Sequence, residues 1–101
     1  MTNIMHPLVY EQLKFVLPAN STDYDVKTEQ ATLFNNVSVA KNVILMFDKE
    51  IKVKFNSTLL PLAILPISRS PFQSPPRWLD TVNIFLTESN GVNVNLEVWL
   101  W

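Results

Sequence analysis

Three residue types are scarce in this chain of 101 residues, and each scarcity excludes a class of site. There is no cysteine, which excludes a disulfide framework and a thiolate nucleophile. The single glycine, Gly91, excludes the glycine-rich loops that bind phosphate groups. The single histidine, His6, excludes any site that needs two imidazoles. We therefore predict that the protein is not an enzyme and has no metal site, cofactor or catalytic residue.

Charge is also scarce, since charged residues make up 17% of the chain, against about 25% in an average globular protein. Eight basic and nine acidic residues leave a net charge of −1. Without a basic excess to neutralise phosphates, we expect no nucleic-acid partner. The most apolar window, Leu59–Ile67, contains two prolines and is far shorter than the roughly 20 residues of a membrane-spanning helix. We expect no membrane partner either.

Apolar residues, at 48% of the chain, are abundant enough for a folded core. Most of them recur with a period of two, which is typical of half-buried strands. The clearest examples are Ile51–Phe55, Val82–Thr87 and Val92–Trp101. The continuous apolar run Val43–Phe47 indicates a central strand that is covered on both faces. The pattern predicts an all-β protein: a single β-sandwich or jelly-roll-like domain over residues 11–101, preceded by an N-terminal arm at residues 1–10.

The last two strands are predicted to form a C-terminal hairpin. Both strands carry their apolar residues at even numbers, so a two-residue loop would pair Leu86 with Asn95, a core position with a surface one. A three-residue loop, Ser89–Gly91, pairs Leu86 with Val94 instead. It also places Gly91 where such a loop needs a left-handed residue.

Large aromatic residues alternate with the core positions of this hairpin. Phe85, Trp99 and Trp101 would lie on its outward face, with Trp101 opposite Leu79. An aromatic side chain buries roughly 150–250 Å² when it is covered, and contiguous exposed apolar patches mark contact sites. Either another segment of the chain covers these residues, or a partner does.

Two further segments are candidates for contacts. Residues 68–77 contain three prolines and three serines and are predicted to form a loop without a hydrogen-bonded ladder. Phe72 in this loop either docks on a neighbour or anchors the loop to its own domain. The arm, which ends at Tyr10, either crosses to a neighbour or forms an edge strand. The residues predicted to lie in an interface are Tyr10, Phe72, Leu79, Phe85, Trp99 and Trp101.

One acidic pair needs a separate interpretation. Asp23 and Asp25 lie two residues apart, on one face of a possible strand. They could form a weak calcium pair, or they could form a solvated edge that discourages aggregation. The second interpretation is the more common one for such a pair.

The strand pattern resembles a known group of proteins. The lysine-alternating strand Ile51–Asn56, the proline-containing strand Leu59–Pro66 and the closing hairpin of Val82–Thr87 and Val92–Val98 look like those of small virion structural proteins of tailed bacteriophages. The resemblance covers residues 43–101. It implies a virion protein that stabilises or decorates a phage particle, by forming homo-oligomers, with trimers favoured, and by contacting major capsid or tail proteins.

A second interpretation remains open beside it. Exposed tryptophans suit the faces of sugars, so a carbohydrate- or receptor-binding module could use Trp78, Trp99 and Trp101 as its platform. Asn93, Asn95 and Glu97 would then supply hydrogen-bonding groups. A soluble monomer with hydrated tryptophans is expected in that case, whereas an assembly protein would have them buried.

Overall fold

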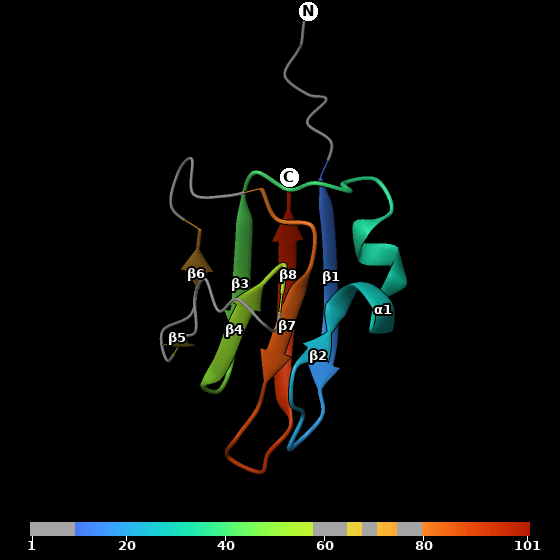
Figure 1. Ribbon diagram of the computed structural model, residues 1–101. Coiled ribbons are helices and arrows are strands. Elements are labelled where there is room, and N and C mark those ends of the chain that lie inside the picture. The colour runs from blue at the N-terminus through green and yellow to red at the C-terminus, as the bar shows by residue number, and fades with distance from the viewer. Residues whose placement is uncertain (1–9, 58–64, 68–70, 75–79) are drawn as a thin grey trace, which may run out of the picture.

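Two antiparallel β-sheets pack face to face in the computed structural model of the protein (Figure 1). The structure describes residues 10–57, 65–67, 71–74 and 80–101. Sheet A consists, in spatial order, of β1 (Glu11–Leu17), β8 (Val94–Leu100), β3 (Val43–Phe47) and β6 (Phe72–Gln73). Sheet B consists of β2 (Tyr24–Asp25), β7 (Ile84–Thr87), β4 (Ile51–Phe55) and β5 (Leu65–Ile67). The prediction of an all-β sandwich is confirmed.

The strands pair in a nested order. β1 pairs with β8, β2 with β7, β3 with β6 and β4 with β5, all antiparallel. Two further pairings, β3 with β8 and β4 with β7, complete the sheets. The first four strands thus pair with the last four in reverse order, as the two halves of one long hairpin would. The resulting orders, β1-β8-β3-β6 and β2-β7-β4-β5, are those of a jelly roll.

The core lies between the sheets and follows the period of two. In β8, alternate residues from Val94 to Leu100 are buried, and in β4 Ile51, Val53 and Phe55 are buried while Lys52 is exposed. Each fully buried large aliphatic or aromatic side chain stabilises the fold by about 1.5–3 kcal/mol relative to an exposed one. Two short helices add Val26, Leu33 and Phe34 to the core: α1 (Val26–Glu29), which contacts β7, and η1 (Ala31–Phe34), which contacts β1.

The predicted C-terminal hairpin is wrong. Strands β7 and β8 belong to different sheets, so their connection crosses from one layer of the sandwich to the other. Leu86 pairs with Val53 and Tyr24, and Val94 pairs with Leu17. Alternation did not reveal this, because two facing strands of a sandwich both point their apolar residues at the same core, as two hairpin strands do.

The crossing between β7 and β8 is held by a buried carboxylate. Glu88 is 2% exposed, and its carboxylate accepts hydrogen bonds from the backbone amides of Asn20 at 2.8 Å, Asn90 at 2.6 Å and Gly91 at 3.1 Å. The amide of Asn20 contributes most to lowering the pKa of Glu88. Gly91 has a φ of +76°, so its predicted left-handed conformation is confirmed even though the hairpin is not.

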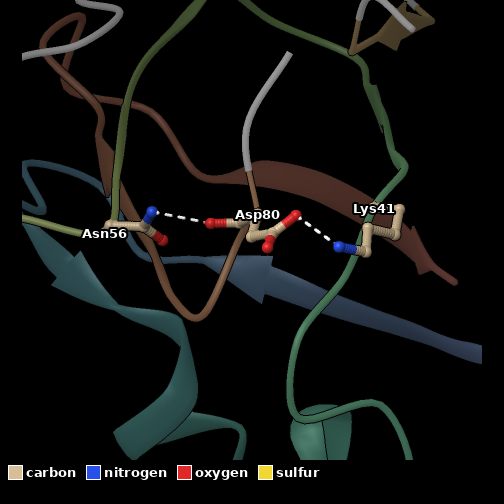
Figure 2. Close-up of polar contacts among 3 residues, drawn as sticks. All are labelled: Lys41, Asn56 and Asp80. Atoms are coloured by element: carbon tan, nitrogen blue, oxygen red, sulfur yellow. Dashed lines mark hydrogen bonds and ion pairs between the residues drawn. The ribbon is translucent and has the colours of Figure 1, made fainter. Parts of the chain in front are cut away.

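A second polar cluster lies at the opposite end of the sandwich (Figure 2). The side chain of Asn56 donates to the carbonyl of Asp80 at 2.9 Å and accepts from the amide of Val82 at 2.8 Å. The Asp80 carboxylate in turn forms an ion pair with Lys41 at 2.8 Å. These contacts join the segments that precede β3 and β7 to the segment that follows β4.

The segment 68–77 is not entirely a loop, contrary to the prediction. Phe72 pairs with Leu45 and Gln73 pairs with Ile44, so that β6 forms the edge of sheet A next to β3. The short strand avoids the prolines, because Pro71 precedes it and Pro75 follows it. An edge strand needs only one side of its backbone for the ladder, which makes such a short stretch sufficient.

Several predictions concern residues outside the described ranges. They include the arm at residues 1–9, residues 59–64 of the predicted proline-containing strand, the remainder of the proline-rich segment, and both Trp78 and Leu79.

Candidate interaction surface

The outer surface of sheet A carries most of the residues with potential for contacts. Side chains that alternate with the core positions of β1, β3, β6 and β8 point away from sheet B. We call this surface the Trp99 face. Its members are Tyr10, Gln12, Lys14, Val16, Ile44, Met46, Gln73, Asn95, Glu97 and Trp99.

The strand pairing arranges these residues in rows across the sheet. In one row Trp99 lies between Gln12 on β1 and Ile44 on β3. In the next row Glu97 lies between Lys14 and Met46. The rings of Tyr10 and Trp99 are stacked, with 5.7 Å between their centroids and 16° between their planes.

Apolar groups on this face are exposed. Tyr10 is 56% exposed, Val16 49% and Met46 38%. The predicted central strand Val43–Phe47 is therefore covered on one side only, because Met46 faces outward. Tyr10 and Met46 lie near Trp99, whereas Val16 lies next to Asn95 and is separated from Tyr10 by Gln12 and Lys14. Exposed apolar groups beside a large aromatic side chain are typical of a contact surface.

A carboxylate fixes the orientation of the indole. Glu97 Oε2 accepts hydrogen bonds from Trp99 Nε1 at 2.9 Å and from Gln12 Nε2 at 2.8 Å. Glu97 Oε1 accepts none from the residues that the structure describes. Lys14 lies directly across from Glu97 in the register, yet it makes no ion pair with any described residue.

A shallow groove of about 580 Å³ runs beside Glu97 on this face. Side chains of Lys14, Val16, Met46, Asp48, Asn95 and Glu97 contribute to its walls. At one end Asp48 accepts two hydrogen bonds from Asn95, one from the backbone amide at 2.9 Å and one from Nδ2 at 2.8 Å. These bonds, the backbone one first, lower the pKa of Asp48.

The outer surface of sheet B differs in composition. Its outward side chains, which we call the Lys54 face, are Asp25, Lys52, Lys54, Phe85 and Thr87. Lys54 Nζ lies 3.1 Å from Oδ1 of Asp23. The Asp25 carboxylate accepts from Asn83 Nδ2 at 2.8 Å and from the amide of Thr28 at 3.1 Å, which caps α1.

Both aspartates of the acidic pair therefore bind groups of their own chain. The residues that the structure describes contain no group of three or more histidine, cysteine, aspartate or glutamate side chains that could hold a metal ion. Helix capping and an ion pair account for the two carboxylates in this structure.

The predicted interface residues do not share one surface. Tyr10 and Trp99 lie together on the Trp99 face, whereas Phe85 lies on the Lys54 face, on the opposite side of the sandwich. Trp101 follows β8 and is half-buried; its backbone exchanges hydrogen bonds with Asn42. The expectation that these aromatic residues form one patch depended on the hairpin and is wrong with it.

Phe72 faces the interior. It is partly buried against the core, and its ring centroid is 6.4 Å from that of Phe55. The structure thus favours the interpretation in which Phe72 anchors its segment to its own domain.

Sequence reasoning missed six members of the surface: Gln12, Lys14, Val16, Ile44, Met46 and Gln73. The alternation of Gln12 and Lys14 with apolar residues does place both on the outward side of a strand. Alternation does not show that β1 and β3 pair with β8, and it is this pairing that brings the side chains next to Trp99 and Glu97.

Comparisons with known proteins give no indication of function, so a proposal for this protein depends on its fold and on the Trp99 face. No family model, curated protein or solved structure matches the chain. Within the described ranges, no helix is both long and apolar enough to cross a membrane.

Proposed function

We propose that this protein is a non-enzymatic virion structural protein that associates with itself, and with capsid or tail proteins, through the Trp99 face. The observation that carries the proposal is the exposure of Tyr10 and Met46 near Trp99, with Val16 exposed further along the same side of the sandwich. Exposed apolar groups are unfavourable in water, and their burial in a contact lowers the free energy. A group of them on one face of a small domain therefore favours association.

A contact on this face would cover apolar surface that is in water in the single chain. Trp99 is itself half-buried, so the gain comes from its remaining exposed surface together with that of Tyr10 and Met46. Each Å² covered contributes about 25 cal/mol before the costs of association. In a symmetric oligomer each copy presents the same patch, so the contribution is repeated at every contact.

The fold agrees with the proposal without deciding it. Jelly rolls are found in viral capsid proteins and in lectins, and a fold shared by several functions does not select one of them. The hydrogen bonds that fix Glu97 to Trp99 and Asp48 to Asn95 favour a rigid contact surface, since less side-chain entropy is lost on association.

A saccharide-binding role is the second candidate, and the same site favours it. The Tyr10–Trp99 stack provides aromatic surface, and Glu97 beside it provides a carboxylate that can accept hydrogen bonds from hydroxyl groups. In this role the tryptophans would remain in water until a sugar binds.

The solution mass, measured by light scattering over a roughly hundredfold dilution together with tryptophan emission, tests the proposal. We expect an oligomer with blue-shifted emission that shifts to the red as dilution dissociates it. A monomer with red-shifted emission at every concentration would contradict self-association, and a glycan array would then test the second candidate.

A further inference from the structure

The charges on the Trp99 face are complementary to those on a second copy of the same face. Lys14 has no ion-pair partner among the described residues, and Glu97 has one carboxylate oxygen that accepts no hydrogen bond from them. Although the two residues are opposite each other on neighbouring strands, Glu97 turns toward Gln12 and Trp99 instead. One cation and one anion are thus left available on each copy.

We propose that the Trp99 faces of two copies pack together about a twofold axis, with Lys14 of each copy paired with Glu97 of the other. This inference rests on the proposed self-association and adds the partner, the symmetry and the ion pair. The axis lies parallel to the sheet and perpendicular to its strands, between the row of Trp99 and the row of Glu97.

This axis matches each row with a suitable one. It places Ile44 of one copy opposite Met46 of the other, and Tyr10 opposite Val16, so that apolar groups meet. It places Lys14 opposite Gln12 of the second copy. Because the Glu97 carboxylate is hydrogen-bonded to Gln12 at 2.8 Å, Lys14 arrives beside that carboxylate.

Two other twofold arrangements bring like charges together. An axis along β8 would place Glu97 opposite Glu97 of the second copy. An axis through the row of Glu97 would oppose both Glu97 with Glu97 and Lys14 with Lys14. Like charges facing each other in a contact disfavour it by several kcal/mol, so these two arrangements are rejected.

The area available predicts a reversible contact. Three strands of about seven residues, spaced about 4.8 Å apart with a rise of about 3.3 Å per residue, present a face of roughly 350 Å² in projection. Even with side-chain relief this lies at or below the roughly 800 Å² per partner of a standard interface. We therefore expect dissociation in a range that dilution can reach.

Charge reversal tests the arrangement. The variants are Lys14→Glu, Glu97→Lys and the double variant, and the control is Lys52→Glu, which reverses an exposed lysine on the Lys54 face. Sedimentation velocity gives the mass and the dissociation constant of each variant, and circular dichroism establishes that each is folded.

The expected pattern is specific to the twofold contact. Each single reversal weakens the dimer about tenfold or more, whereas the double reversal restores it, because charges that meet are again opposite. The two single variants also dimerise when mixed, since both ion pairs of the mixed dimer are attractive. The Lys52→Glu control changes the dissociation constant by less than about twofold.

Glu97→Lys also removes two hydrogen bonds, and it could unfold the protein. Lys14→Glu mixed with the unchanged protein then serves instead, and its dimer should have an intermediate dissociation constant. A trimeric mass, or an oligomer indifferent to Lys14→Glu, would overturn the twofold contact while leaving self-association standing. A monomer at every concentration would overturn both.

Discussion

The two outer faces of the sandwich are built from the same alternating strands but differ in how their polar groups are satisfied. On the Lys54 face, Lys54 is paired with Asp23, and Asp25 binds Asn83 and caps a helix. On the Trp99 face, the polar groups surround exposed apolar side chains, and Lys14 lacks an ion-pair partner among the described residues. Lys52 on the Lys54 face also makes no ion pair with a described residue, so unpaired charge alone does not distinguish the two faces. What distinguishes the Trp99 face is its exposed apolar side chains, on which the proposed contact depends.

The largest expected difference between the faces comes from their aromatic residues. Trp99→Ala should raise the dissociation constant of the oligomer by roughly thirtyfold or more, as for a residue at the centre of a contact. Phe85→Ala should leave it unchanged, because Phe85 lies on the Lys54 face. Sedimentation velocity at several concentrations measures both.

Thermal unfolding of both variants serves as the control for this pair, since a truncated aromatic side chain also lowers stability. Equal weakening of association by the two substitutions would show that the faces do not differ as proposed. Association unaffected by Trp99→Ala in a folded variant would remove the Trp99 face from the contact.

A smaller effect is expected on the stability of the folded protein when the ion pair of the Lys54 face is removed. Lys54→Ala leaves Asp23 without its ion pair and should lower the free energy of unfolding by about 1 kcal/mol, since both side chains are partly buried. Urea unfolding at low and high salt measures the loss. Lys52→Ala, at an exposed position of the same strand, is the matched control and should change stability by less than about 0.5 kcal/mol.

Association should be the same in the Lys54→Ala variant and in the unchanged protein. A weakened oligomer would mean that the Lys54 face also takes part in contacts, and the proposed division of roles between the faces would be incorrect.

The smallest effect concerns the polar end of the Trp99 face and depends on pH. Hydrogen bonds from Asn95 lower the pKa of Asp48 in the folded state. The stability that this carboxylate contributes is therefore complete above the unfolded pKa of about 3.9 and is lost as the pH falls through the lower folded pKa. Asp48→Ala should cost about 0.5 kcal/mol at neutral pH, because the group is well exposed.

Urea unfolding between neutral and acidic pH checks this prediction. The curves for Asp48→Ala and the unchanged protein should converge as the pH falls below about 4. Glu50→Gln, at an exposed position in the same turn, should leave the difference between neutral and acidic pH nearly unchanged. A constant gap between the Asp48→Ala curve and that of the unchanged protein at all pH values would show that Asp48 acts by some means other than its charge.

Much of the fold could be predicted from the alternation of residues. The inward and outward sides of β4 and β8 are as predicted, and so is the left-handed conformation of Gly91. The candidate surface could be predicted only in part: Tyr10 and Trp99 were named, but Phe85 was assigned to the same patch although it lies across the sandwich.

The surface was predicted only in part because alternation shows which side of a sheet a residue faces but not which strands are paired. A side chain's side of a strand follows from the period of two of the extended backbone, so in β4, β7 and β8 the sequence by itself determined which residues form the core. The continuous apolar run of β3 did not show which of its sides faces inward. Backbone hydrogen-bonding groups are the same for every strand, so alternation cannot say which strands are neighbours.

Only the tertiary structure decided that β8 lies between β1 and β3. That arrangement buries inward residues of β1, β3, β4, β7 and β8 in one layer between the sheets. It also brings Gln12, Lys14, Ile44 and Met46 around Trp99 and Glu97, from segments far apart in the chain. The core was thus determined by local alternation, and the surface by long-range pairing.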